Sequence, residues 1–524
     1  MGCAQGPRLR REPDGDNTGA TLPAKEEMMK APRRMFRMML VAFAGASLLA
    51  PLAARGGEVI DVGDRRELFV DGHLIERLDN ARLTAHEPRY EGKVVMFDKP
   101  WEGKFSFYST VIKDGDTYRL YYRGLPKGEH DTGWESLCYA ESNDGIHWRK
   151  PNLGVLEVKG VKKNNVIITN SEPATHSFSP FLDAKPGVPD AQRFKALGLQ
   201  RTPGNQDWCL AAFVSADGKH WTRFREEPVI LNDTDHFAFD SQNVAFWSQS
   251  EEKYIAYFRT WKDGIRRISR ATSDNFIRWS SSQLMEYRRN GEPAPIHHLY
   301  INQTHPYFRA PHIYIATAAR FMPGRRVLTD AEAKAIGVNP NYFRDTSDSV
   351  LMTSRGGAIY DCTFMNALIR PGIGARNWVS RTNYAALNVV QTGPTEMSIY
   401  VNRDYAQSTA HLARYSLRLD GFGSARGPYE GGEVITKPLR FKGGRLSINY
   451  STSAAGSVRI EIQDEAGNAL PGYALADCRE IIGDEIERVA AWKNGNDVGT
   501  LAGKPVRLRF VLRDADLYAF RFAE

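Results

Sequence analysis

Three carboxylates in the sequence stand beside residues that could hold a sugar. Asp240 opens the polar run DSQN, Glu102 follows Trp101 in PWEGKF, and Glu135 follows Trp134 in GWES. Two carboxyl groups on either side of a glycosidic bond can donate a proton and attack the sugar or activate water. Asp240 is therefore the first catalytic candidate, with Glu102 or Glu135 as its partner. The alternative is that these acids are solvated strand caps or members of ion pairs.

A second set of candidates consists of side chains that could bind the substrate. Arginines end several strand-like runs, as in LYYRG, AYFRTW and TAARF. Guanidinium forks bind carboxylate or sulfate groups bidentately, which predicts an anionic sugar such as a uronic acid or a sulfated residue. The alternative is that the arginines neutralise nearby acids and brace the fold. The predicted substrate-binding residues are Arg123, Trp134, His176, His236, Arg259, Trp261, Arg320 and Arg381.

A repeated turn indicates which elements position these residues. SNDGIHW (Ser142 to Trp148) returns as SADGKHW (Ser215 to Trp221) and as TSDNFIRW (Thr272 to Trp279). A spacing of this size is typical of a supersecondary unit repeated in space. Asp can cap backbone N–H groups, Gly can adopt positive φ and Trp can pack between neighbouring units, so we expect the turn to be structural.

Each turn closes a run of alternating strands joined by hairpins, which predicts an all-β chain. Residues 55–422 contain five such four-stranded units, the pattern of a five-bladed β-propeller. The fifth unit lacks the closing turn, and we expect RRELFVDGHLIE (Arg66 to Glu76) to supply its missing outer strand. Residues 423–524 continue as alternating strands without the turn and predict a C-terminal β-sandwich.

The chain begins with a predicted export signal. Within residues 1–54, the basic run RRMFR precedes the apolar run MMLVAFAGASLLAPLAA, which ends in small residues. This pattern is typical of a signal peptide and predicts a secreted or periplasmic protein without an integral membrane span. The formal net charge of +7 is too small and scattered for a nucleic-acid partner.

Four cysteines follow the leader and are expected to be buried free thiols, the alternative being a disulfide or a metal site. They are Cys138, Cys209, Cys362 and Cys478. No motif for a cofactor and no spacing typical of metal ligands is present. The sequence leaves the oligomeric state open.

Five units with S-x-D-G-x-x-W turns, an export signal and a C-terminal sandwich together resemble the five-bladed propeller glycosidases, above all the family 32 invertase and fructan-hydrolase group. The Trp-Met-Asn-Asp-Pro, Arg-Asp-Pro and Glu-Cys signatures of that group are absent, so its catalytic residues are not transferred. The resemblance implies that first strands begin, and second strands end, around a central pocket. It places Glu396, a tempting acid in QTGPTEMSIY, on the opposite face.

These observations together predict an exported glycoside hydrolase-like enzyme acting on a poly- or oligosaccharide. In that reaction one carboxylic acid protonates the leaving oxygen while Asp240 attacks or activates water. The alternative class is a non-catalytic carbohydrate-binding propeller, which would keep the aromatic and arginine side chains without paired acids. A third possibility is a structural surface protein whose central mouth is filled by side chains.

Overall fold

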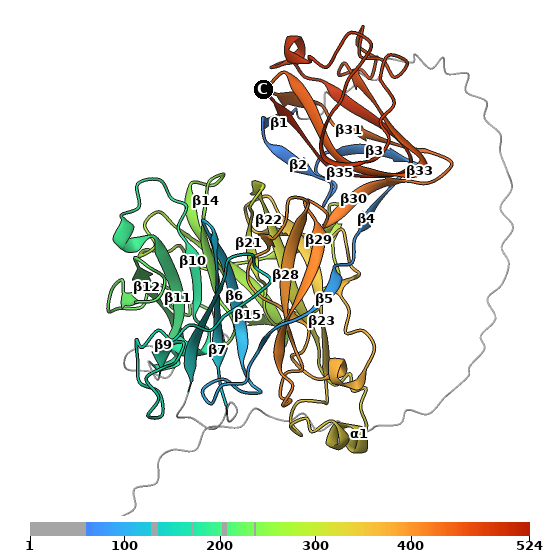
Figure 1. The fold of residues 1–524 in the computed structure, drawn as a ribbon. Helices are drawn as coiled ribbons and strands as arrows, with labels where there is room; N and C mark the ends of the chain where they lie inside the picture. Colours follow the sequence, from blue (N-terminus) through green and yellow to red (C-terminus); the bar gives the residue numbers. More distant parts are fainter. Residues whose placement is uncertain (1–58, 127–134, 170–171, 202–206, 235–236) are drawn as a thin grey trace, which may run out of the picture. The chain divides into compact units, whose positions relative to one another are not determined.

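The computed structural model describes residues 59–126, 135–169, 172–201, 207–234 and 237–524. Almost all of the regular secondary structure in this part of the chain is β-strand (Figure 1). The strands form where apolar and aromatic residues alternate with polar ones, as in TYRLYYRG (Thr117–Gly124), which is buried over most of its length. The predicted leader lies outside the described residues.

Three antiparallel sheets follow one another along the chain, each with four strands in sequential order. The first contains β6 (Phe107–Asp114), β7 (Thr117–Gly124), β8 (Ser136–Ser142) and β9 (Val166–Thr169). The second contains β10 (Ser179–Leu182), β11 (Phe194–Arg201), β12 (Trp208–Ser215) and β13 (Thr222–Arg223). The third contains β14 (Val244–Ser248), β15 (Lys253–Lys262), β16 (Ile265–Ser273) and β17 (Gln283–Leu284).

Two further sheets are built on long central hairpins. One pairs β22 with β23 and includes β18 (Glu286–Arg289), β19 (Glu292–Pro293), β20 (His298–Leu299), β21 (Thr304–Tyr307), β22 (Ala310–Met322), β23 (Thr346–Ser354), β24 (Ile359–Asp361) and β25 (Ala367–Ile369). The other includes β26 (Tyr384–Ala385), β27 (Val390–Gln391), β28 (Glu396–Arg403), β29 (His411–Arg418) and β5 (Arg89–Met96).

The outer strand of this last sheet comes from the N-terminal side of the chain, but not from the predicted segment. β5 pairs with β29, with His411 opposite Met96. The prediction that Arg66 to Glu76 would take this place is wrong, because Arg66–Leu68 (β2) pairs with β35 (Arg507–Ala523). Both segments alternate in the same way, and periodicity alone does not identify the partner strand.

The sheets form a propeller-like arrangement in which neighbouring sheets contact one another through their first strands. β6 contacts β10, β10 contacts β14, β14 contacts β21, β22 contacts β26, and β27 and β28 return to β6. In Figure 1, β6, β10 and β14 of three different sheets lie side by side. At the return, Leu387 accepts a hydrogen bond from the Val111 amide at 3.0 Å and donates one to the Ser109 carbonyl at 2.8 Å.

The repeated turns are structural, as predicted. In the first, Asp144 accepts hydrogen bonds from the amides of Ile146 and His147, both at 2.8 Å, and Gly145 has φ +74°. Trp148 packs edge-on against Tyr400 of another sheet, whose hydroxyl donates to the Gly145 carbonyl. The turn therefore ties two sheets together.

We expect Gly145→Ala to destabilise the protein through this contact. An added Cβ would lie 2.9 Å from the Tyr400 hydroxyl and 2.8 Å from Thr392. Gly115 has a similar φ of +59°, and a Cβ added there would have no atom within 4 Å. Gly115→Ala therefore measures the cost of the backbone strain without a steric clash. In denaturant titrations the Gly145 variant should lose about 1–3 kcal/mol more than the Gly115 variant. Equal losses would show that the turn does not pack as described.

The C-terminal part of the chain forms a second β-structure that also takes in the first strands. Its larger sheet contains β2, β3 (Ile75–Asp79), β4 (Arg82–Ala85), β30 (Gly423–Gly427), β31 (Gly432–Thr436), β33 (Arg445–Gln463), β34 (Asp484–Val489) and β35, and a parallel pair joins β1 (Ile60–Gly63) to β32 (Leu439–Phe441). Trp492, Phe510 and Phe520 lie in its core. Residues 60–85 thus pair with strands beyond residue 422, across the predicted boundary.

Helical structure is confined to short segments. The insertion after β22 contains α1 (Asp330–Ala335), as its sequence predicts, and Thr329 and Glu332 form a capping box at its start. The 3-10 turns are Glu172–His176, Asp190–Gln192, Ala375–Trp378 and Gly499–Leu501. Within the described ranges no helix has the length and apolar character needed to cross a bilayer.

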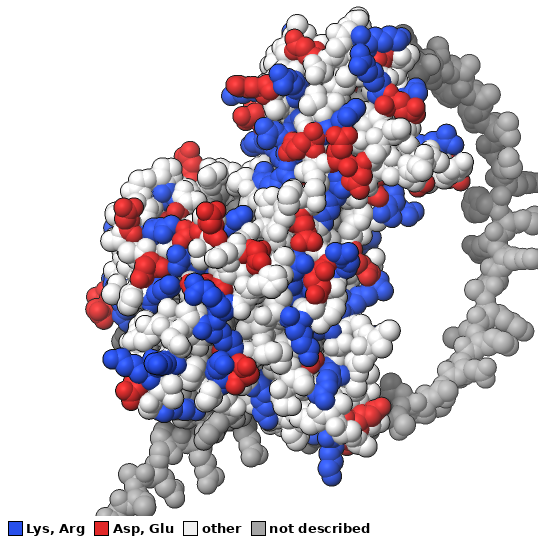
Figure 2. All heavy atoms as spheres, in the orientation of Figure 1, with Lys and Arg blue, Asp and Glu red and all other residues white. Residues whose placement is uncertain are grey.

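The thiols agree with the sequence-based expectation that they are buried and unpaired by disulfides. Cys138, Cys209, Cys362 and Cys478 are buried, and none of the four is in a disulfide. Figure 2 shows lysine and arginine interspersed with aspartate and glutamate over the face in view.

Candidate functional site

Segments that lead into first strands, together with residues at the adjoining ends of second and third strands, bring their polar side chains together. We call this group the axial cluster: Tyr108, Arg123, Glu135, His176, Asp240, Arg259, Arg266, Tyr300 and Arg381, joined by the contacts given below. Tyr108 lies at a register shift in β6, a feature that redirects a side chain. Tyr108 and Arg381 have φ of +52° and +58°, and Phe239, next to Asp240, has φ +67°. Such backbone strain is concentrated at functional sites.

Two carboxyl groups in the axial cluster face one imidazole ring. His176 Nδ1 lies 2.9 Å from Glu135 Oε1, and His176 Nε2 lies 3.8 Å from Asp240 Oδ1. The Asp240 side chain is 38% exposed and that of Glu135 is 24% exposed. Both can therefore be reached from solvent, and the imidazole ring of His176 lies between them.

Arg259 holds the Asp240 carboxylate from the buried side. Arg259 Nη2 donates to Asp240 Oδ2 at 2.8 Å, and the arginine side chain is only 2% exposed. Although burial opposes its charge, the Asp240 carboxylate helps to raise the pKa of Arg259 above its ordinary value. The ion pair suits Asp240 to act as an anion, either as nucleophile or as base.

Arg123 supports the imidazole from the neighbouring sheet. Its Nη1 lies 3.1 Å from the His176 ring nitrogens, and its Nη2 donates to the Phe105 carbonyl at 3.2 Å. The same guanidinium lies 4.9 Å from the centre of the Tyr108 ring. Arg123 is buried, so we assign it to positioning His176.

Tyr300 is the centre of a group of arginines. The guanidinium carbons of Arg259, Arg266 and Arg381 lie 4.9, 5.3 and 5.3 Å from its ring centre. Arg266 was not among the sequence-based candidates, which were drawn from strand starts and second-strand ends. It is the cross-strand partner of Trp261 in the β15–β16 hairpin, and that pairing is the signal that could have identified it.

Trp261 lies at the same end of the third sheet. The Arg266 guanidinium stacks over its indole at 4.4 Å, and His298 packs edge-on at 6.0 Å. Trp261 Nε1 is buried and has no hydrogen-bond partner within the described residues. Trp261 contacts the axial cluster through Arg266. This position is compatible with the predicted substrate-binding role of Trp261.

Glu102 is not brought into the axial cluster. It is fully buried and accepts hydrogen bonds from the Tyr122 hydroxyl at 2.5 Å, from Lys150 Nζ at 2.7 Å and from the Lys99 amide at 3.0 Å. The neighbouring Trp101 is buried too and donates to Asn165. With every partner internal, Glu102 has the geometry of a structural ion pair.

We expect Glu102→Gln to reduce stability and leave the chemistry unchanged. The substitution removes the buried charge that faces Lys150 and should lower the free energy of unfolding by about 2–4 kcal/mol. Asp98 is the other partner of Lys150, and the Asp98 side chain is 59% exposed. Asp98→Asn should therefore lower the free energy of unfolding by less than about 1 kcal/mol. If the activity per folded molecule of Glu102→Gln fell more than tenfold, Glu102 would again be a catalytic candidate.

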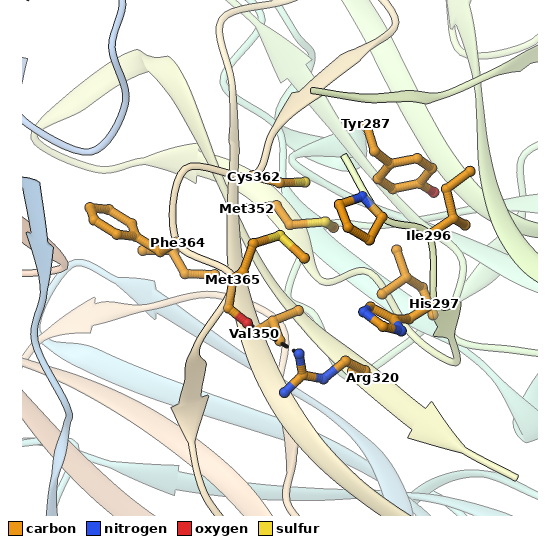
Figure 3. Close-up of a pocket in the computed structure, with 12 residues that line it drawn as sticks. Tyr287, Ile296, His297, Arg320, Val350, Met352, Cys362, Phe364 and Met365 are labelled. Atoms are coloured by element: carbon orange, nitrogen blue, oxygen red, sulfur yellow. Dashed lines mark hydrogen bonds between the residues drawn. The ribbon is translucent and has the colours of Figure 1, made fainter. Parts of the chain in front are cut away.

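Arg320 also lies outside the axial cluster. Its Nε and Nη2 donate to Asp348 at 2.9 and 2.6 Å, and its Nη1 donates to the Met365 carbonyl at 3.1 Å. It borders a small pocket that is lined mainly by apolar side chains such as Met352 and Phe364 (Figure 3). Both ends of the guanidinium fork are occupied, so the predicted substrate contact is replaced by an internal ion pair.

The remaining candidates lie apart from the axial cluster or outside the described residues. Arg403 is buried and donates to the Tyr415 hydroxyl and the Pro371 carbonyl. Glu396 begins β28 and pairs with Arg414 at 2.7 Å, at the hairpin end of the sheet, as the strand pattern predicts. Trp134 and His236 lie outside the described residues.

Comparison with known proteins finds only distant structural matches. No family model and no curated protein matches the chain. An N-acetylgalactosamine deacetylase from F. plautii, in complex with blood group B trisaccharide, is 12% identical over 65% of this chain and 96% of its own, with a TM-score of 0.42. A family 43 arabinoxylan arabinofuranohydrolase from Bacillus subtilis is 10% identical over 81% of this chain and 97% of its own, with a TM-score of 0.37.

Proposed function

We propose that the chain is a secreted or periplasmic glycoside hydrolase-like enzyme that cleaves glycosidic bonds in a poly- or oligosaccharide. The observation that carries this proposal is the pair of solvent-accessible carboxyl groups, Asp240 and Glu135, on opposite nitrogens of His176. Paired carboxyl groups are the minimum equipment for glycosidic cleavage. The proposal includes a resemblance to the glycoside hydrolase family 32 propellers and does not include membership of that family.

The architecture that we propose for this enzyme is a five-bladed propeller followed by a β-sandwich. The contacts between first strands run from β6 through β10, β14 and the β21–β22 sheet to the β26–β29 sheet and back to β6. That circuit supports five blades around one axis. The N-terminal strands β1–β4, which pair with C-terminal strands, are assigned to the sandwich.

In the proposed mechanism the two acids have different roles. Asp240, paired with Arg259, stays anionic and attacks the sugar or activates water. Glu135 and His176 share a hydrogen bond through which a proton can be held next to the leaving oxygen. The arginines around Tyr300 support an anionic sugar, uronic or sulfated, as the substrate.

The alternative is a carbohydrate-binding propeller without catalysis, in which the acids would only hydrogen-bond sugar hydroxyls. Reducing-end release from a panel of neutral, uronic and sulfated glycans distinguishes the two. The proposal predicts release from at least one of them. Binding to members of the panel with no release from any would favour the binding protein.

A further inference from the structure

Among the arginines around Tyr300, Arg266 carries a positive charge that no carboxylate of the described residues pairs with. Arg259 is engaged by Asp240, as described above. Arg266 forms no ion pair with a carboxylate anywhere in the described ranges, and its nearest polar side-chain partner is His298 Nδ1, 3.5 Å from Nη1. A half-buried cation without a counter-ion is costly, and this cost falls when a ligand supplies the anion.

The surroundings of Arg266 reinforce this imbalance. Burial and the neighbouring Arg259 lower the pKa of Arg266, and Arg381 acts in the same direction. The buried Nε of Arg266 and the buried Nε and Nη1 of Arg259 have no hydrogen-bond partner among the described residues. Buried donors of this kind are normally satisfied, so their presence here points to a partner supplied from outside the chain.

Asp345 interacts electrostatically with Arg266 and Arg381, but it forms no ion pair with Arg266 among the described residues. Burial raises the pKa of Asp345 even though Ser380, Arg381 and Arg266 favour its charged form. Its Oδ1 is buried and accepts no hydrogen bond from the described residues. A carboxyl group whose charged form is opposed by burial is a weak counter-ion, which leaves room for a second anion.

We propose that Arg266, together with Arg381 and Arg259 against the Tyr300 ring, forms an anion subsite for a carboxylate or sulfate group on the sugar held at Asp240 and Glu135. The inference rests on the proposed function and names its substrate class. Forked guanidinium groups match the oxygens of both anions, and the Trp261 indole beneath Arg266 keeps the fork in place.

Calorimetric binding to the intact protein tests the subsite independently of catalysis. The probes are methyl glucuronide, a 6-O-sulfated methyl galactoside and the matching uncharged methyl glycosides. We expect at least one charged probe to bind the wild type tenfold or more tighter than its uncharged match. Arg266→Gln should abolish this preference, Arg266→Lys should restore part of it, and Arg278→Gln, at an exposed turn residue, should leave it unchanged.

The outcomes separate this inference from the proposed function. Equal binding of charged and uncharged probes, or a preference that survives Arg266→Gln in a folded variant, overturns the subsite even if neutral glycans are cleaved. A preference that depends on Arg266 supports the subsite even if no glycan in the panel is cleaved. The charged probe that binds more tightly identifies carboxylate or sulfate as the group recognised.

Discussion

Asp240→Asn should lower the rate of reducing-end release by about a thousandfold or more. An amide can neither attack the sugar as an anion nor take a proton from water. It can still offer an oxygen to Arg259, which lies 2.8 Å from the present carboxylate. The measurement is kcat on the glycan that the wild type cleaves fastest.

Two controls protect this result from a trivial explanation. The Asp240 variant should unfold within a few degrees of the wild type, since removal of the charge leaves a hydrogen bond to buried Arg259 in place. Asp116→Asn makes the same chemical change at an exposed hairpin between β6 and β7 and should leave kcat unchanged. Near-normal release by a folded Asp240→Asn protein would remove Asp240 from the mechanism.

Glu135→Gln should slow release by about a hundredfold to ten-thousandfold, because the amide cannot carry the proton that the leaving oxygen needs. His176, 2.9 Å from Glu135, would retain its contacts with Arg123 and Asp240. The loss should shrink on aryl glycosides whose phenol leaves without protonation. That dependence on the leaving group is specific to a proton donor.

A different result would reassign Glu135. If the loss were equally large on activated and unactivated glycosides, Glu135 would have the role of nucleophile or base, and Asp240 would be the remaining acid. If Glu135→Gln cleaved both kinds of glycoside at the wild-type rate, the paired-acid mechanism would be wrong. Both classes of glycoside can be measured with one enzyme preparation.

The repeated turn made much of the fold predictable from the sequence. Asp144 and Gly145 satisfy local backbone requirements, so their pattern is visible in any one copy. The segment that pairs with β29 as the outer strand of its sheet was not predictable in this way. β5 and the predicted segment Arg66 to Glu76 both alternate, and only long-range packing decides which of them pairs with β29.

The candidate site was predictable where position along the chain alone brings side chains together. Asp240, His176, Arg259 and Glu135 meet for this reason. Glu102 precedes a first strand as well, but its side chain turns into the sheet toward Tyr122 and Lys150. Arg320 similarly turns to Asp348, because the register of β22 and β23 places the two residues opposite each other.

The paired role of Asp240 and Glu135 is the central claim, and a double-mutant cycle on reducing-end release tests it most directly. Two groups that act in one reaction give strongly non-additive losses, so the double variant Asp240→Asn/Glu135→Gln should be about as slow as the slower single variant. A folded double variant that still releases reducing ends at more than a tenth of the wild-type rate would contradict the claim and place the chemistry elsewhere on the chain.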